Sequence, residues 1–253
     1  MLRVSGILGG PKAYFGRQLW GHPLYAWGLL SQNERVITLW KKRLRFLALL
    51  FDIVRLDHAS GFFSYCSLDP TDPAHDTLEP GPGFPVFKEI ITYCHMVRLR
   101  PYAEGIETKA PKEALAKLRV GAIRIFRFAY NEKINEIVGK YANIASYPPN
   151  TTAYTALHDT EPLMGYLVLL TSEQKKLIAR IASVGYSSNS KTLVVRLREA
   201  VVNSPSRMVI IPIQDWLLTE DRINIPGTEK AKDDPNWHYR LSVPVEQLPQ
   251  ITF

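Results

Sequence analysis

The alternation of helical patterns with short apolar runs is the feature that most constrains the fold of this sequence. The expected helices cover residues 34–51, 84–96, 111–118, 172–184 and 191–202. The expected strands cover residues 52–57, 97–104, 122–130, 151–157 and 207–215. Strands that alternate with helices favour a parallel sheet with crossover helices. The pattern therefore predicts an α/β fold with a parallel sheet, as in a (β/α)8 TIM barrel.

Acidic and histidine side chains follow several of the expected strands. The residues at these strand ends are Asp57, His58, Glu104, His158, Asp159 and Asp215. In a (β/α)8 barrel, catalytic residues lie at the carboxyl ends of different strands, around one mouth. Any single acid in such a position could also be the N-cap of the next helix or part of a polar rim. Their recurrence across strands favours a functional site.

Carboxylates in such a set suit chemistry at a glycosidic bond. One acts as the nucleophile and another as general acid and then base, with the carboxyl groups about 5–5.5 Å apart when the anomeric configuration is retained. The acid needs a raised pKa, which burial beside another carboxylate supplies. A third acid can bind sugar hydroxyls next to the reacting carbon. The strand ends offer candidates for all three roles.

The chain is basic, with a formal net charge of +7, so nucleic-acid binding has to be weighed. The Lys and Arg residues are spread along the sequence, and the densest group, within residues 41–45, falls on an expected helix. No module of interleaved aromatic and basic residues, such as an RNP motif, accompanies them. We therefore expect no nucleic-acid partner.

The cysteines and the apolar runs indicate the cellular compartment that we expect. Cys66 and Cys94 lack the spacing of metal ligands or of a disulfide framework. The run from Phe46 to Val54 contains Asp52 and is too short to span a bilayer, and the first ten residues lack the apolar core of a signal peptide. We expect a cytoplasmic chain with no metal site and no membrane association.

Six motifs occur in an order that resembles one enzyme family. They read RQLWGHPLYAW, VRLDHASGF, PYAEGIE, IRIFRFAY, TAYTALHD, and DRINIPGT followed by NWHYRL. Together they are similar to glycoside hydrolase family 77, the 4-α-glucanotransferases known as amylomaltases, within the α-amylase clan. The resemblance implies transfer of α-1,4-glucan segments between maltooligosaccharides, with retention and without a cofactor. It also implies that α-1,4-glucans and maltooligosaccharides are the binding partners.

The resemblance assigns three catalytic residues. Asp57 matches the nucleophile, Glu104 the general acid/base, and Asp159 the carboxylate that stabilises the transition state. Arg55, two residues before Asp57, matches the arginine that keeps the nucleophile ionised by charge pairing.

The resemblance also assigns substrate-binding residues. His58 and His158 match histidines that bind sugar hydroxyls, and Asn224 matches a substrate-binding asparagine. Gln18 and Trp20 match the substrate wall, although Trp20 could also be an ordinary core aromatic.

The sequence departs from the family pattern at several positions. Gly105 stands where the family carries a second acid, and Glu107 lies too far along the chain to replace it. Thr160 stands where the family has asparagine. His22 and Ala26 change the first motif, and the preceding loop is about two residues shorter than usual.

The resemblance begins partway through the family sequence, just before the fourth barrel strand. Residues 1–253 are therefore expected to form a single domain, the C-terminal part of a glucanotransferase barrel with roughly its last five strands. Such a barrel would not close alone, and a second chain could supply its front. The alternatives to an active transferase are an inactive or truncated relative that binds glycan or acts as a scaffold, or half of a split enzyme.

Overall fold

The computed structural model describes residues 4–8, 16–27, 30–105, 108–226, 228 and 236–248. The chain divides into two compact units, Met1–Ile123 and Arg124–Phe253, and each unit has its own hydrophobic core. The shortened loop before Gly16 and the acid Glu107 lie outside the described residues.

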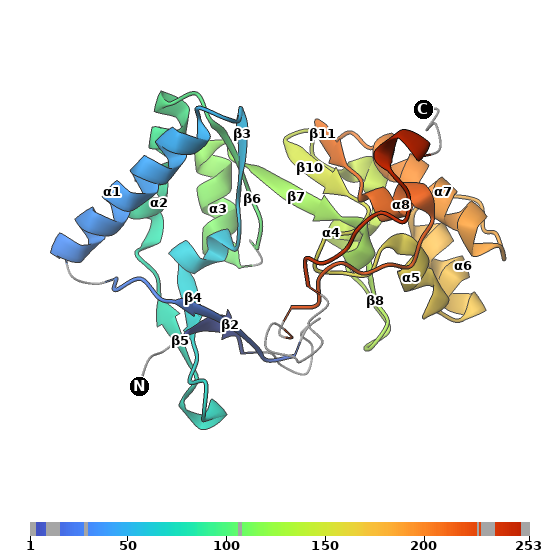
Figure 1. Ribbon diagram of the computed structural model, residues 1–253, viewed down its shortest axis with the longest axis horizontal. Helices are drawn as coiled ribbons and strands as arrows, with labels where there is room; N and C mark the ends of the chain where they lie inside the picture. Colours follow the sequence, from blue (N-terminus) through green and yellow to red (C-terminus); the bar gives the residue numbers. More distant parts are fainter. Residues whose placement is uncertain are drawn as a thin grey trace. The chain divides into compact units, whose positions relative to one another are not determined.

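The first unit contains the expected alternation of helices and strands (Figure 1). In chain order its main elements are α1 (Leu30–Leu47), β3 (Ile53–Leu56), α2 (Gly83–Met96), β6 (Arg100–Ala103), α3 (Lys109–Leu118) and β7 (Gly121–Ile125), whose last two residues belong to the second unit. Helix α2 packs between α1 and α3. All six elements were expected from the sequence, although the strands are shorter than the apolar runs.

The burial of α2 follows from its sequence pattern. Its buried side chains are Val86, Phe87, Ile90, Ile91 and Cys94. These positions recur at intervals of three and four residues and so form one apolar stripe. The stripe packs in the first core together with Leu44 of α1 and Leu56 of β3.

The apolar stripe expected over residues 34–51 is only partly buried. Helix α1 begins at Leu30 and ends at Leu47, earlier than the pattern indicated. Leu44 is 1% exposed, whereas Leu39 is 40% exposed and Leu50, beyond the end of the helix, is 60% exposed. The helix therefore turns only part of this stripe toward the core.

Two antiparallel hairpins were not expected from the sequence. Strand β1 (Val4–Ile7) pairs with β2 (Gln18–Pro23), and β4 (Ser64–Ser67) pairs with β5 (Thr77–Pro80). Short 3-10 turns η1 (Ala59–Phe62) and η2 (Pro73–His75) flank β4. These strands are four to six residues long, too short for a clear alternating pattern.

The second unit is mainly helical. Its elements are η3 (Phe126–Phe128), β8 (Tyr130–Asn131), β9 (Glu136–Ile137), α4 (Gly139–Ala142), η4 (Ile144–Ser146), β10 (Thr151–Tyr154), α5 (Leu163–Val168), α6 (Ser172–Ile181), α7 (Ser190–Val202), β11 (Met208–Ile210), α8 (Ile213–Leu217) and η5 (Val245–Gln247). Helices α6 and α7 were expected. Each begins at a side-chain cap, Thr171 for α6 and Asn189 for α7.

The central sheet has five strands in the order β11-β10-β7-β6-β3. The pairs β3–β6, β6–β7 and β10–β11 are all parallel. The expected α/β fold with about five parallel strands is therefore confirmed. Strand β7 ends at Ile125 rather than continuing to Tyr130, because the chain enters the 3-10 turn η3. No described helix is long and apolar enough to cross a membrane.

Asp215 does not extend the set of strand-end acids that the sequence suggested. It lies in α8 and its exposure is 0%. Its carboxylate accepts a 2.5 Å hydrogen bond from the Thr155 hydroxyl and a 2.6 Å bond from the Leu163 backbone N–H at the start of α5. Asp215 therefore ties α8 to the residues after β10 and acts as a structural acid.

Burial raises the pKa of Asp215 from its usual value of 3.8 to about 6, and its hydrogen bonds only partly offset this effect. Between these two pH values the folded chain holds a proton that the unfolded chain releases, so stability falls as the pH rises. The stability lost by pH 7 is on the order of 3 kcal/mol. Asp215→Asn removes this dependence.

We therefore expect Asp215→Asn to gain stability relative to the unchanged chain as the pH is raised from 4.5 to 7. Urea unfolding of both chains at the two pH values measures this difference. A difference that is independent of pH, or that grows in the opposite direction, contradicts the assignment.

Candidate active site

The parallel pairing of β3 with β6 aligns two candidate catalytic acids. In this register Leu56 lies opposite Ala103, and these are the last residues of the two strands. Asp57 and Glu104 are the next residues along each chain. The Glu104 N–H donates to the Leu56 carbonyl at 3.1 Å, and the Glu104 carbonyl accepts from the Ala59 N–H at 2.8 Å. The backbone pairing therefore continues past both acids.

The Glu104 side chain turns toward the segment that carries Asp57. Its Oε2 accepts a 3.0 Å hydrogen bond from the backbone N–H of His58. His58 has φ 45° and ψ 49°, a left-handed conformation that is uncommon for a residue with a side chain. Outliers of this kind are often found at functional sites. The Glu104 carboxylate is thus fixed to the residue directly after Asp57.

Arg55 and Asp57 form an ion pair on the same face of β3. Arg55 Nη2 lies 2.7 Å from Asp57 Oδ1. The Arg55 side chain is 19% exposed, whereas that of Asp57 is 76% exposed. The guanidinium therefore stabilises the negative charge from the protein side, and the carboxylate remains accessible to a ligand.

His58 links these acids to the hairpin strand β2. The Trp20 ring meets the His58 ring edge-on, with 5.1 Å between centroids. Trp20 Nε1 donates to Gln18 Oε1 at 2.9 Å, which orients the indole. Burial lowers the pKa of His58, although the charge of Asp57 opposes this effect. The imidazole is therefore held in its neutral form near pH 7.

The backbone conformation at position 105 requires glycine, in addition to the loss of the acid that the family pattern has there. The φ of Gly105 is +70°, a conformation that glycine adopts without a steric penalty. A Cβ at this position would lie 3.1 Å from His58 Cα and 3.3 Å from His58 Nδ1. A side chain here would therefore press on the residue that binds Glu104.

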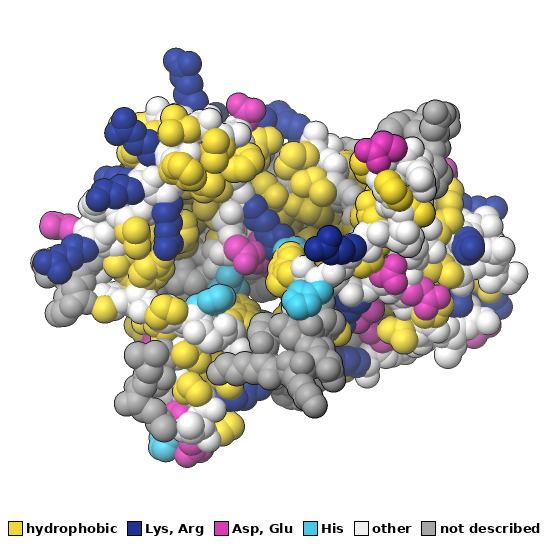
Figure 2. All heavy atoms as spheres, viewed as in Figure 1, with side chains coloured by type: hydrophobic (Ala, Val, Ile, Leu, Met, Phe, Trp, Pro, Cys, Tyr) yellow, Lys and Arg dark blue, Asp and Glu magenta, His cyan; other side chains and the backbone are white. Residues whose placement is uncertain are grey.

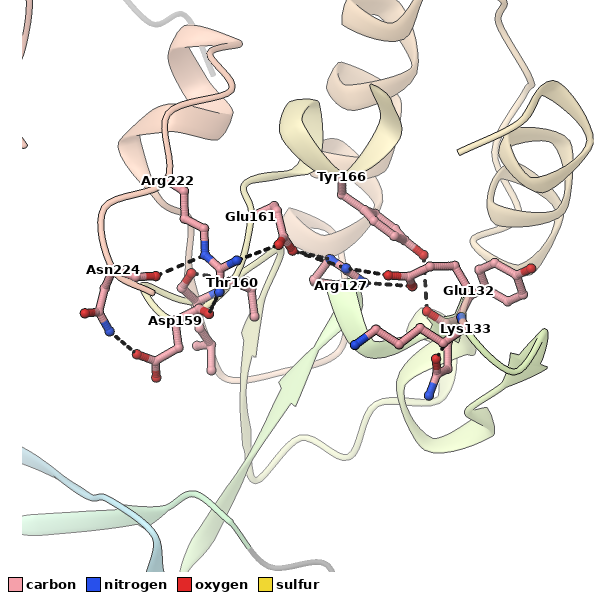
Figure 3. Close-up of polar contacts among 12 residues, drawn as sticks. Arg127, Glu132, Lys133, Asp159, Thr160, Glu161, Tyr166, Arg222 and Asn224 are labelled. Carbon is pink, nitrogen blue, oxygen red and sulfur yellow. Dashed lines mark hydrogen bonds and ion pairs between the residues drawn. The ribbon is translucent and has the colours of Figure 1, made fainter. Parts of the chain in front are cut away.

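The second unit groups the remaining predicted residues around Asp159. Asn224 Nδ2 donates to Asp159 Oδ1 at 2.5 Å (Figure 3). His158 Nε2 lies 3.1 Å from Asp159 Oδ2. The His158 and Asp159 side chains are 35% and 32% exposed, so both remain accessible. Residues 65 positions apart in the sequence therefore meet at one carboxylate.

The tight turn that contains His158 and Asp159 is closed by Thr160, which is 4% exposed. The Thr160 Oγ1 accepts from the Leu157 N–H at 3.1 Å and lies 3.2 Å from the Leu157 carbonyl, to which it donates. The hydroxyl therefore closes the turn that presents His158 and Asp159.

Two residues missed by the sequence analysis hold this group together. Arg222 donates to the Asp159 carbonyl at 2.6 Å, to the Asn224 carbonyl at 3.0 Å and to Glu161 Oε1 at 2.7 Å. Glu161 and Arg222 each stand two residues from a predicted site residue, Asp159 and Asn224 respectively. This spacing was the available signal.

Trp237 was also missed as an individual residue, although its motif was noted. Its indole lies 5.3 Å from the His158 ring, measured between centroids, and it is 67% exposed. Its backbone N–H donates to the Ile223 carbonyl at 3.0 Å. An exposed aromatic ring therefore lies directly beside one of the predicted sugar-binding histidines.

The two units thus hold separate groups of predicted residues. The first contains Gln18, Trp20, Arg55, Asp57, His58 and Glu104, and the second contains His158, Asp159 and Asn224. His22 and Ala26 are both exposed in the first unit. In the part of the chain that the structure describes, no group of three or more His, Cys, Asp or Glu residues could hold a metal ion.

We expect Gly105→Ala to destabilise the chain by about 1–2 kcal/mol, because an alanine must adopt a left-handed conformation and displace His58. Urea unfolding measures the loss, and the NMR resonances of the His58 imidazole report the displacement. Gly139→Ala is the matched control, because a Cβ there meets no atom within 4 Å. Equal stabilities for the two variants would contradict the strain at Gly105.

Comparison with known proteins adds independent findings. A family model described as 4-alpha-glucanotransferase matches residues 3–246. The 4-alpha-glucanotransferase of Thermus thermophilus is 26% identical over an alignment of 258 residues, gaps included. That alignment covers 98% of this chain and 49% of that protein. The chloroplastic/amyloplastic 4-alpha-glucanotransferase of Solanum tuberosum is 26% identical over 95% of this chain and 40% of that protein.

Solved structures show the same fold. The amylomaltase from Streptococcus agalactiae in complex with acarbose has a TM-score of 0.74 at 23% identity, covering 95% of this chain and 47% of that one. The amylomaltase from Corynebacterium glutamicum has a TM-score of 0.69 at 20% identity and covers 93% and 38%.

These matches cover nearly the whole of this chain, which in turn spans about half the length, or somewhat less, of the curated relatives. The family match and the similarity of fold agree with the family that the motifs indicated. The chain belongs to the 4-α-glucanotransferases of glycoside hydrolase family 77.

Proposed function

We propose that this chain carries the catalytic acids of a 4-α-glucanotransferase, which transfers α-1,4-glucan segments between maltooligosaccharides in glucan metabolism. The observation that supports this most strongly is the alignment of Asp57 with Glu104. The two acids follow paired strand ends, and the Glu104 carboxylate binds the N–H of the residue after Asp57. A retaining mechanism requires two carboxyl groups near each other, and acids that follow neighbouring, paired strand ends suit that requirement.

In the first step of the proposed reaction, the Asp57 carboxylate attacks the anomeric carbon of the donor. The bond to the leaving 4-oxygen breaks, and Glu104 gives that oxygen its proton. In the second step, the Glu104 carboxylate takes the proton from the 4-hydroxyl of an acceptor sugar. That oxygen then attacks the anomeric carbon and releases Asp57. Bonds, protons and charges balance without a cofactor.

The neighbouring residues have proposed roles that follow from their contacts. Arg55 holds the Asp57 carboxylate in place by its 2.7 Å ion pair. A neutral His58 contacts a sugar hydroxyl, and Trp20, oriented by Gln18, provides a flat apolar surface for a glucosyl ring. An aromatic face suits the C–H face of a sugar.

We propose that Asp159 stabilises the positive charge that develops on the sugar, and that His158 and Asn224 bind hydroxyl groups beside it. The support is their mutual hydrogen bonding and their partial exposure. Residues 1–253 act in this proposal as part of one catalytic domain. A reducing, cytoplasmic compartment fits the free thiols of Cys66 and Cys94.

Asp57→Asn removes the proposed nucleophile but keeps the shape of the side chain. We expect it to reduce the conversion of maltotriose into glucose and longer oligosaccharides by more than about 100-fold, because no covalent intermediate forms. Product analysis by chromatography over time measures this. Asp52→Asn is the matched control, because Asp52 is an exposed acid at the other end of the same strand. Transfer that persists in Asp57→Asn contradicts the mechanism.

A non-catalytic role in glycan binding is the second candidate function. Gly105 favours it, because the acid that the family pattern has beside Glu104 is absent and the backbone does not readily accept a side chain there. The two functions differ in the unchanged chain: a binding protein retains maltoheptaose without converting it, whereas a transferase redistributes its glucose units.

We further propose that the outer edge of β3 is covered, in the working enzyme, by the part of the relatives that this chain does not match. That part would be supplied by a longer polypeptide or by a second chain. Among the described strands, β3 stands at one end of the sheet. In the segment that leads into β3, the side chains of Phe46, Leu49, Leu50 and Phe51 are 57–77% exposed. Figure 2 shows hydrophobic side chains gathered on this part of the surface.

An exposed patch of this kind promotes self-association when it is left uncovered. We expect Leu49→Glu with Leu50→Glu to reduce both dye binding and self-association of the isolated chain, with little loss of stability because both side chains are exposed. Fluorescence of an apolar dye and sedimentation velocity measure the two effects. Leu169→Glu, at a side chain 63% exposed in the second unit, is the control. Equal effects of the Leu49→Glu/Leu50→Glu and Leu169→Glu substitutions would contradict the proposal that the β3 edge is normally covered.

A further inference from the structure

Glu161 and Arg222 lie at the centre of an ion-pair network behind Asp159 (Figure 3). The Arg222 guanidinium reaches two segments that are distant in sequence, through the carbonyls of Asp159 and Asn224. The Asp159 and Asn224 side chains hydrogen-bond to each other. The distance between the backbones of these two segments is therefore fixed by one side chain.

Glu161 fixes the position of that guanidinium. Its Oε1 accepts from Arg222 Nη1 at 2.7 Å, and its Oε2 accepts from Arg127 at 3.2 Å and 3.3 Å. Arg127 is 3% exposed and stacks over the Tyr166 ring, with 3.6 Å between the guanidinium carbon and the ring centroid. The Glu161 carboxylate is thus shared between two arginines, one of which is buried and held in place by packing.

The charge of Glu161 is maintained by its surroundings. Burial alone would raise the pKa of this carboxyl, but its backbone hydrogen bond and the positive charges of Arg127 and Arg222 together lower it. Glu132 accepts hydrogen bonds from the far side of Arg127 at 3.1 Å and 3.4 Å. The network therefore alternates Glu132, Arg127, Glu161 and Arg222 and ends at the backbone of Asp159 and Asn224.

We propose that Glu161 and Arg222 are positioning residues that hold the Asp159 carboxylate and the Asn224 amide in the geometry needed at the site. The inference rests on the proposed function of Asp159. Arginine suits this role because its planar fork can donate to several acceptors at once, as it does here to two carbonyls and a carboxylate. Neither residue is proposed to touch the substrate.

A network that merely stabilised the fold would behave differently from a positioning network. Glu132 and Glu161 both bind Arg127, so removing either charge disturbs the buried guanidinium. Glu161 also contacts Arg222, and through it the two site segments. Glu161→Gln is therefore the informative variant, and Glu132→Gln is its matched control.

The first measurement needs no glucan. The side-chain amide of Asn224 donates a 2.5 Å hydrogen bond to a carboxylate, so its proton resonance should lie well downfield of that of a free amide. We expect Glu161→Gln to move this resonance toward the free value and Glu132→Gln to leave it in place. A shift of equal size in both variants, or no shift in Glu161→Gln, overturns the proposal.

The second measurement is kinetic and uses the maltotriose reaction. We expect Glu161→Gln to lower kcat by about tenfold with little change in KM, because Asp159 acts on the transition state rather than on the ground state. Glu132→Gln should retain both constants within about twofold. If the unchanged chain transfers no glucan, the proposed function fails, and the Asn224 resonance still decides whether Glu161 positions the pair.

Arg222→Lys provides a second variant if Glu161→Gln does not fold. Lysine keeps the charge that pairs with Glu161 but cannot span both carbonyls. We expect the same displacement of the Asn224 resonance in this variant. An unchanged resonance in a folded Arg222→Lys chain overturns the proposal.

Discussion

The parallel pairing of β3 with β6 is the constraint on which the rest of the first site depends. The register sets Leu56 opposite Ala103, so the chain emerges from both strands at the same level. Asp57 and Glu104 are then the first residues after the paired positions, and the left-handed turn at His58 points a backbone N–H at the Glu104 carboxylate. A shift of one residue in this register would move one acid away from the other.

The second unit positions its acid, Asp159, in a different way. Its acid is not fixed by strand register but by a turn that Thr160 closes and by a guanidinium that joins two distant segments. Asp159 is thereby presented between His158 and Asn224. The Glu161–Arg222 pair is half-buried, and breaking it would leave a partly desolvated charge unpaired, so it suits the task of fixing geometry. In both units hydrogen bonds to the backbone next to an acid help to fix its position.

The sequence predicted the parts of the fold that repeat a pattern. The apolar stripe of α2 and the alternation of helices with strands come from local periodicity, and both are present. The β1–β2 hairpin was missed because its strands are too short to show a period. Asp215 was misread as a strand-end acid because its partners, Thr155 and Leu163, lie more than 50 residues away.

The site could be predicted only in part, for similar physical reasons. The motifs indicated the acids, but Arg222 was noted only as part of its motif, because its partners at Asp159 and Glu161 lie more than 60 residues away in the sequence. Gly105 was interpreted as a lost acid, whereas its φ of +70° and its closeness to His58 show a steric constraint as well. Both features arise from backbone geometry that a one-dimensional pattern does not contain.

The central claim is that Asp57 is the nucleophile and that Glu104 transfers the proton. α-Glucosyl fluoride tests it most directly, because fluoride leaves without a general acid. With Glu104→Gln, the first step should proceed and the second should stall, so one glucosyl group accumulates on the enzyme. Mass spectrometry of the digested chain should find that group on Asp57. A glucosyl group on another residue, or none on a chain that turns over the fluoride, would contradict the claim.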